Sequence, residues 1–155
     1  MPQPQVGQPA PDVTLLGAEN KERKLSEFRG QNLVLFFFPK AFTGTCERQI
    51  SEHAQNIQKF KELNTQVIGV STDQVPSQAA FAKQCNPNGE VLLLSDFRHK
   101  AIQEYGVAVE QGPRANDRAT FIIDKNGVLR YKFIEPDAGK FQGIDPELAE
   151  LQQLK

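Results

Sequence analysis

The chain has 155 residues, of which 39% are hydrophobic and 24% charged, and 18 basic side chains nearly balance 19 acidic ones. These values are typical of one globular domain and exclude the strong basic field that a nucleic-acid-binding surface needs. No apolar run approaches the length of a membrane span. The first eleven residues lack the basic start and apolar middle of a secretory signal. We therefore expect a single domain over 1–155, in the cytoplasm, with no nucleic-acid or membrane partner.

The predicted elements alternate between strands and helices. In chain order they are a hairpin with strands 13–16 and 22–25, a buried strand 32–38, a helix 46–63, a buried strand 66–71, a helix 76–84, a strand 91–94, a helix from 96 to about 105, strands 119–123 and 128–133, and a final helix from 145. Asp73 and Asp96 are expected to cap the helices that follow them. This order predicts an α/β fold, with a central mixed β-sheet flanked by helices and an N-terminal β-hairpin extension.

The segment around Cys46 is the most informative part of the chain. The apolar run 33–38 ends at Pro39, a short loop of small residues follows, and Cys46 opens an amphipathic helix. Free N–H groups and the helix dipole at a helix N-terminus stabilise a thiolate, which is the nucleophilic form of cysteine. The position therefore favours a reactive thiol over an inert core residue.

The pattern Pro-x-x-x-Thr-x-x-Cys, formed by Pro39, Thr43 and Cys46, resembles the signature of the peroxiredoxins, thiol peroxidases of the AhpC/TSA family. Segments 67–73, 92–96 and 118–124 resemble later landmarks of the same family, in the same order. The resemblance covers roughly residues 5 to 135, and it is closest to the PrxQ (bacterioferritin-comigratory) or AhpE-like branch. It implies a thioredoxin-like fold.

The resemblance makes Cys46 the peroxidatic nucleophile, which attacks a peroxide oxygen and becomes a sulfenic acid. Thr43 would cap the helix, contact the thiolate or the peroxide, or do both. Pro39 would end the strand and shield the thiol. Gly44 would let the backbone approach the substrate closely. The amides of Thr45 and Cys46 would donate to a peroxide oxygen.

Arg118 is the expected second charge of the site. In the family, an arginine at this position lies against the peroxidatic sulfur, where it would favour the thiolate and polarise the O–O bond. Without the family match, a solvated arginine at a strand edge would be the simpler interpretation. Arg114, in the same loop, is the fallback. Gln49, one turn after Cys46, matches a position where the PrxQ branch often has a side chain hydrogen-bonded around the site.

Cys85, the second thiol, has two interpretations. It is either an incidental cysteine on a surface helix or a resolving cysteine that captures the sulfenic acid of Cys46 in an intramolecular disulfide. Some relatives place the resolving cysteine on this helix and others five residues after the peroxidatic one, but position 51 here is Ser51. AhpE-like members use an external thiol instead.

The family resemblance implies no haem, flavin or metal. His53 and His99 do not form a zinc motif with the two cysteines, because their spacing fits no compact metal site. The expected partners are hydrogen peroxide or organic hydroperoxides and a thioredoxin- or glutaredoxin-like reductant, and the expected assembly is a monomer or weak homodimer. A one-cysteine peroxidase and a redox sensor or holdase remain as alternatives.

Overall fold

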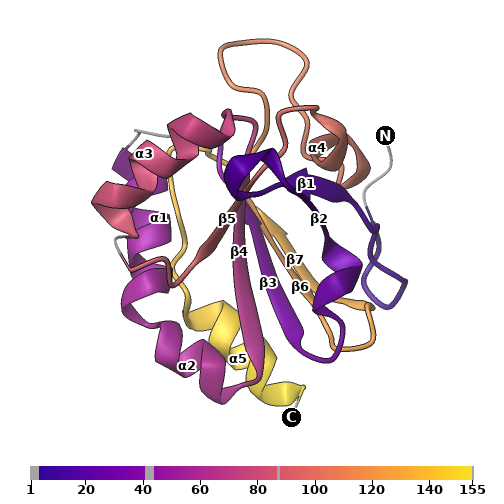
Figure 1. The fold of residues 1–155 in the computed structure, drawn as a ribbon. Coiled ribbons are helices and arrows are strands. Elements are labelled where there is room, and N and C mark those ends of the chain that lie inside the picture. The colour runs from indigo at the N-terminus through magenta and orange to yellow at the C-terminus, as the bar shows by residue number, and fades with distance from the viewer. Residues whose placement is uncertain (1–3, 41–43, 87, 155) are drawn as a thin grey trace.

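The computed structural model describes residues 4–40, 44–86 and 88–154 (Figure 1). In chain order the elements are β1 (Thr14–Leu16), the 3-10 helix η1 (Ala18–Asn20), β2 (Glu22–Lys24), the 3-10 helix η2 (Leu25–Phe28), β3 (Asn32–Phe37), α1 (Gly44–Gln55), α2 (Ile57–Glu62), β4 (Thr65–Ser71), α3 (Val75–Cys85), β5 (Leu92–Ser95), α4 (Lys100–Glu104), β6 (Ala119–Ile123), β7 (Leu129–Ile134) and α5 (Asp145–Gln153).

The described strands form one mixed sheet in the order β2-β1-β5-β4-β3-β6-β7. Strands β3, β4 and β5 are parallel, whereas β6 and β7 and the β1–β2 hairpin pair antiparallel. All six residues of β3 are buried, as expected of a strand covered on both faces. The predicted α/β fold with a mixed sheet and an N-terminal hairpin is confirmed.

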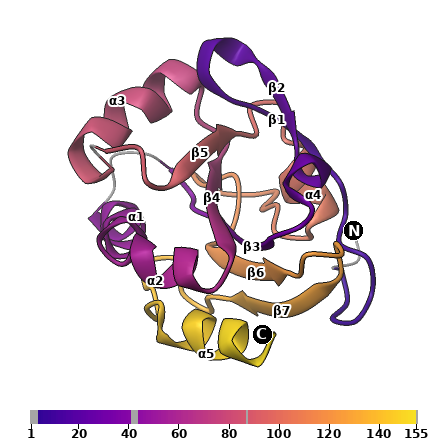
Figure 2. The same cartoon turned by 60° about the horizontal axis from the view of Figure 1, so that its bottom comes forward.

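Alternate side chains of the central strands feed two separate cores. Leu35 and Phe37 of β3 pack on the side of α4, with Tyr105 and Phe121. Val34, Phe36 and Phe38 face the other side, where the core also contains side chains of α1, α2, α3 and α5. Figure 2 shows these two layers on opposite sides of the sheet. Cys46 and Cys85 both belong to the second core.

One glycine shapes this second core. A Cβ on Gly69 of β4 would lie 2.7 Å from the ring of Phe36. The missing side chain lets the Phe36 ring lie against the strand, and from there the ring stacks on His53 of α1 with 4.6 Å between ring centroids.

Three local predictions were wrong. The single helix 46–63 is two helices, because Asn56 between α1 and α2 leaves helical geometry, with φ −112° and ψ 19°. The helix 96–105 is reduced to α4, although Asp96 does accept the N–H groups of Ala101 and Ile102. The N-cap position of α3 is Gln74, one residue after the predicted Asp73, and the Gln74 side chain makes no cap bond.

Among the described residues, no helix combines the length and the apolar character that a membrane span requires.

Candidate active site

Cys46 lies at the carboxyl end of β3, as the third residue of α1 in the described part of the chain. It is fully buried and packs in the same core as Phe38 and Ile50. The prediction of a thiol in the first turn of a helix is therefore confirmed. The expectation that it is not a core residue is wrong, because the helix lies flat on the sheet and turns this position inward.

Arg118 reaches the sulfur from the neighbouring strand. It directly precedes β6, whose first residue, Ala119, pairs with Phe37 near the end of β3. Its guanidinium donates from Nη2 to the Cys46 sulfur at 3.2 Å, and its side chain is buried. A buried positive charge and a hydrogen-bond donor therefore lie on the sulfur that the sequence predicts as the nucleophile.

Two further bonds fix the orientation of the guanidinium. Arg118 Nη1 donates to Gln49 Oε1 at 2.6 Å, and Nε donates to the Ala138 carbonyl at 3.0 Å. The amide nitrogen of Gln49 is buried and has no hydrogen-bond partner among the described residues. Gln49 thus holds the arginine on the sulfur and keeps one donor free within the site.

The other predicted site residues differ in their burial and in their hydrogen-bond partners. Pro39 is half-buried just after β3, and Gly44 is exposed at the start of α1. The Thr45 hydroxyl donates to the Gly139 carbonyl at 2.8 Å. Thr43 lies outside the described residues. The fallback Arg114 pairs with Asp117 on the surface, at 3.0 Å.

Cys85 ends α3 and is also buried, with 4% of its surface exposed. Burial raises the pKa of this thiol to about 11, and the negative charge of Glu47 acts in the same direction. Its sulfur donates to the Phe81 carbonyl at 3.5 Å. Both thiols are free, and the Ser51 hydroxyl of α1 donates to the Cys85 carbonyl at 3.4 Å.

His53, which the sequence analysis considered only as a metal ligand, is fully buried. Its Nε2 lies 2.7 Å from Glu147 Oε1 of α5, and its Nδ1 lies 2.7 Å from the Gln49 carbonyl. Both ring nitrogens are therefore engaged. The described residues hold no group of three potential metal ligands. Cys46, Ile50 and His53 share one buried helical face, and that spacing was the signal in the sequence for the burial of His53.

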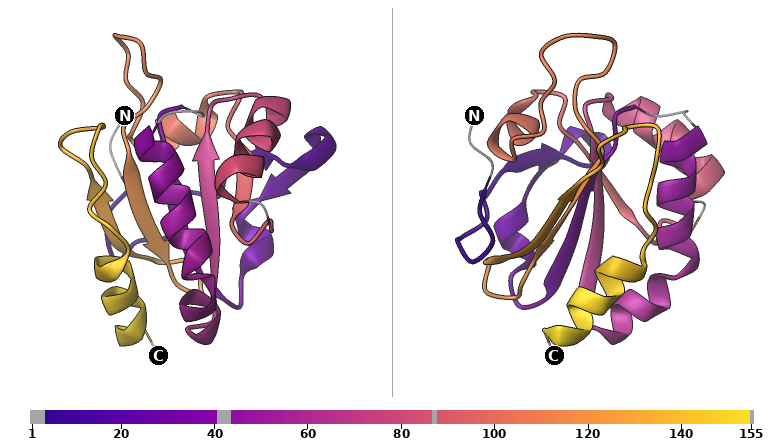
Figure 3. Two further views of the ribbon diagram at one scale, coloured as in Figure 1. Left: turned by 90° about the vertical axis from the view of Figure 1, so that its left-hand side faces the viewer. Right: turned by 180° about the vertical axis from the view of Figure 1, so that it is seen from behind.

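A segment without regular structure runs beside α1. We call residues 137–144, which join β7 to α5, the strap. Its Gly139 and Phe141 carbonyls accept bonds from Thr45 and Arg48, and its Ile144 amide donates to Glu52. Both views in Figure 3 show the strap next to α1. The sequence analysis assigned no role to this segment.

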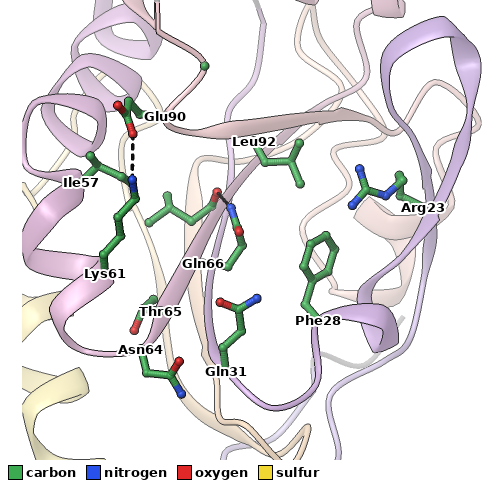
Figure 4. Close-up of a pocket in the computed structure, with 12 residues that line it drawn as sticks. Arg23, Phe28, Gln31, Ile57, Lys61, Asn64, Thr65, Gln66, Glu90 and Leu92 are labelled. Atoms are coloured by element: carbon green, nitrogen blue, oxygen red, sulfur yellow. Dashed lines mark hydrogen bonds and ion pairs between the residues drawn. The ribbon is translucent and has the colours of Figure 1, made fainter.

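A cavity of about 530 Å³ lies at the opposite end of the sheet, near the start of β4 and β5 (Figure 4). Its charged side chains are already paired, Lys61 with Glu90 and Arg23 with Glu27. None of the predicted site residues lines this cavity. The chemistry that the sequence predicts is therefore confined to the end of the sheet that carries Cys46.

Comparisons with known proteins agree with the fold. Residues 6–132 match the model of the AhpC/TSA family. A peroxiredoxin-like protein from Aquifex aeolicus has a similar crystal structure, with a TM-score of 0.90 and 25% identity over 100% of this chain and 90% of that one. The mitochondrial 2-Cys peroxiredoxin from Plasmodium falciparum gives a TM-score of 0.81 and 26% identity over 97% of this chain and 94% of that one.

Two curated relatives are similar to this chain in sequence. The mitochondrial thioredoxin-dependent peroxide reductase of Drosophila melanogaster is 39% identical over 81% of this chain and 56% of its own length. The chloroplastic peroxiredoxin Q of Sedum lineare is 33% identical over 96% of this chain and 78% of its own. The chain spans about half the length of several relatives that it matches. Together these findings show that the chain belongs to the AhpC/TSA family, the peroxiredoxins, on the peroxiredoxin Q branch.

Proposed function

We propose that this protein is a thiol peroxidase that reduces hydrogen peroxide and organic hydroperoxides through Cys46. The observation that carries the proposal is the 3.2 Å contact between Arg118 Nη2 and the Cys46 sulfur, within a chain of the AhpC/TSA family. A buried cation on a thiol in the first turn of a helix provides a nucleophile and a donor for an oxygen leaving group.

In the first step, the Cys46 thiolate attacks one peroxide oxygen, the O–O bond breaks, and the second oxygen leaves as water or an alcohol after taking a proton. Cys46 is oxidised to a sulfenic acid and the peroxide is reduced. The guanidinium of Arg118 would stabilise the charge that moves from sulfur to the leaving oxygen. The Thr45 and Cys46 amides and the free amide nitrogen of Gln49 are the donors proposed for the substrate oxygens. Pro39 and Gly44 would shape the approach to the sulfur, and Thr43 remains a predicted contact.

In the second step, we propose that the Cys85 thiol attacks the sulfenic sulfur, releases water and forms an intramolecular disulfide. The contact between Ser51 and the Cys85 carbonyl supports this assignment. Position 51 is where other peroxiredoxins are expected to carry the resolving cysteine. The end of α3 thus places Cys85 beside position 51 of α1, where a resolving cysteine would lie in those other peroxiredoxins.

We propose that this second step involves a rearrangement of the end of α3. An α-helix rises about 1.5 Å per residue, so Ser51 lies about 7.5 Å along α1 from Cys46. A disulfide needs Cα atoms within about 7 Å. Burial also raises the pKa of Cys85 to about 11, which keeps this thiol protonated at neutral pH. Unwinding the end of α3 would bring the two sulfurs together and expose Cys85 to water, where it ionises more readily.

A dithiol partner would reduce the disulfide and complete the cycle. The name of the Drosophila relative, a thioredoxin-dependent peroxide reductase, supports a thioredoxin-type reductant, and a glutaredoxin-like protein is the alternative. A cytoplasmic location and a monomer or weak homodimer stay as predictions.

The experiment is steady-state peroxide consumption by the purified protein with thioredoxin, thioredoxin reductase and NADPH. We expect NADPH oxidation that scales with the protein concentration and continues over many turnovers. A Ser51→Ala protein, which keeps both thiols, is the matched control for changes near the site. A single stoichiometric burst with every dithiol reductant tested would contradict the peroxidase assignment and favour a redox sensor or holdase.

The one-cysteine alternative has its own signature. If an external thiol resolves the sulfenic acid, turnover with a small-molecule thiol would be the same in Cys85→Ser and in the unsubstituted protein.

A further inference from the structure

The buried pair of His53 and Glu147 is the most unusual feature outside the contacts of the sulfur. Both side chains are completely buried, and they join α1 to α5 at 2.7 Å. The imidazole ring lies among the rings of Phe36, Phe60 and Phe141, at centroid distances of 4.6, 5.5 and 5.8 Å. Burying an ion pair in such an apolar setting costs desolvation free energy that apolar side chains would not incur.

The geometry requires the imidazole to donate from Nδ1. The Gln49 carbonyl that it faces has no proton to give, so Nδ1 carries the hydrogen. Glu147 Oε1 lies 2.7 Å from Nε2, and an imidazolium that donates to this carboxylate oxygen satisfies both contacts. In agreement, the pKa of His53 is raised: burial by itself lowers it, but the charge and hydrogen bond of Glu147 outweigh that effect.

The pair is connected to the thiol through a short series of bonds. His53 bonds the backbone of Gln49, the side chain of Gln49 accepts from Arg118, and Arg118 contacts the Cys46 sulfur. Each bond is between 2.6 and 3.2 Å. A displacement of α1 at His53 would therefore be passed to the guanidinium that faces the sulfur.

The same pair ends a series of contacts between α1 and the strap. From the start of α1 onward, Thr45, Arg48 and Glu52 bond the strap, and His53 then bonds Glu147 just beyond it. The strap also supplies the Ala138 carbonyl that accepts from Arg118 Nε. One side of α1 is thus fixed along its length, and the last contact is the most buried.

We propose that His53 and Glu147 are positioning residues for Cys46. They hold α1 and the strap in the arrangement in which Gln49 and the Ala138 carbonyl accept hydrogen bonds from Arg118. In that arrangement Arg118 donates to the Cys46 sulfur. This inference rests on the proposed function, because it concerns how fast Cys46 reacts with peroxide. The second carboxylate oxygen of Glu147, Oε2, is buried and has no hydrogen-bond partner among the described residues. The carboxylate therefore acts through the contact of Oε1 with His53.

The test is the Glu147→Gln variant, with Glu150→Gln on the same helix as matched control. An amide cannot neutralise an imidazolium, and a neutral His53 can no longer donate from both nitrogens. We expect the second-order rate constant for Cys46 oxidation by hydrogen peroxide, measured by stopped flow, to fall about tenfold, as misplaced reacting groups do. Glu150→Gln should react at the rate of the unsubstituted protein.

A double variant separates positioning from stability. In His53→Phe with Glu147→Leu, apolar side chains replace the pair among the three aromatic rings, and such replacements often keep or raise stability. We expect a melting temperature near that of the unsubstituted protein, a slower reaction with peroxide, and a smaller thiolate fraction of Cys46 at neutral pH by ultraviolet absorbance. Formation of the disulfide after oxidation should not be slowed.

The outcomes are distinct. If the double variant melts normally and both variants oxidise at the unsubstituted rate, the pair is structural and the positioning role is wrong. If the unsubstituted protein itself does not react with peroxide, the proposed function fails first. A slow Glu147→Gln protein with the thiolate fraction unchanged in both variants would also contradict the inference, because Arg118 would then still be in place.

Discussion

The two thiols lie in the same core, but the segments that carry them are held very differently. The start of α1, with Cys46, is fixed by Arg118, which directly precedes β6, and by a strap bond to Thr45. The end of α3, with Cys85, is held by a local clamp, in which the Asn86 side chain bonds both the amide and the carbonyl of Val91. Buried side-chain bonds from a distant segment hold the nucleophile, whereas the end of α3 is held by this local clamp and by one 3.4 Å bond from the Ser51 hydroxyl to the Cys85 carbonyl.

This difference suggests which end moves during the proposed cycle. Peroxide reduction needs a sulfur and a cation in fixed positions, and the start of α1 provides them. Disulfide formation needs one segment to leave its place, and the end of α3 can do so without disturbing the contact between Arg118 and Cys46. The predictions below test this division, from the largest expected effect to the smallest.

Removing the nucleophile should remove the activity. Cys46→Ser leaves Cys85 as the only thiol, and we expect peroxide turnover to disappear while the circular dichroism spectrum stays the same. Coupled NADPH oxidation measures turnover. Activity that persists in Cys46→Ser would mean that the nucleophile has been misidentified.

Removing the cation should leave a slow enzyme. Arg118→Met takes away the charge and the donor at the sulfur, and we expect the rate constant with peroxide to fall about 100-fold, as the loss of one such donor does in other enzymes. A lower thiolate fraction at neutral pH should accompany it. Stopped-flow oxidation measures the rate. Arg114→Met, on the surface, is the control and should change neither quantity.

Removing the resolving thiol should separate the two steps. In Cys85→Ser, the first oxidation of Cys46 should proceed at the unsubstituted rate, because Cys85 is not in contact with the guanidinium. Thioredoxin-supported turnover should fall, and the sulfenic acid should accumulate and react with dimedone. Full turnover in this variant would assign the protein to the one-cysteine class.

Loosening the end of α3 should speed the second step. Asn86→Ala removes two buried hydrogen bonds to Val91, worth about 1 kcal/mol each. If unwinding there limits disulfide formation, its rate should rise several-fold, with no change in the oxidation of Cys46. Rapid quenching and thiol alkylation after a peroxide pulse measure it. An unchanged rate would place the limiting movement at α1 instead.

The buried pair should give the smallest effect, a pH dependence of stability. Burial alone would lower the pKa of His53, but the charge and hydrogen bond of Glu147, with smaller contributions from the Gln49 carbonyl and Glu52, raise it above its ordinary value of 6.5. Its stabilisation is then complete below that ordinary value and is lost as the pH rises through the raised one. The difference in unfolding free energy between the unsubstituted protein and Glu147→Gln, from urea titrations, should therefore shrink with rising pH. A constant difference would mean that the pair does not titrate in this way.

Local patterns predicted most of the fold and the centre of the site. The apolar run of β3 and the break at Pro39 place Cys46, and the family resemblance places Arg118 on the next strand. What the sequence could not show depends on contacts between distant segments. The partner of the buried His53 is Glu147, which is 94 residues away, and no periodicity in either helix reveals that partner. The helix break at Asn56 has a local cause that the apolar periodicity does not show, because the Asn56 side chain donates to the Glu52 carbonyl one turn earlier.

The most direct test of the account is mass spectrometry of the reduced protein after one equivalent of hydrogen peroxide, with free thiols alkylated before digestion. The account predicts a single crosslinked peptide that joins Cys46 to Cys85 within one chain, with no unmodified Cys46 thiol remaining. A sulfenic acid on Cys46 with Cys85 fully alkylated, or a disulfide that joins two chains, would contradict it.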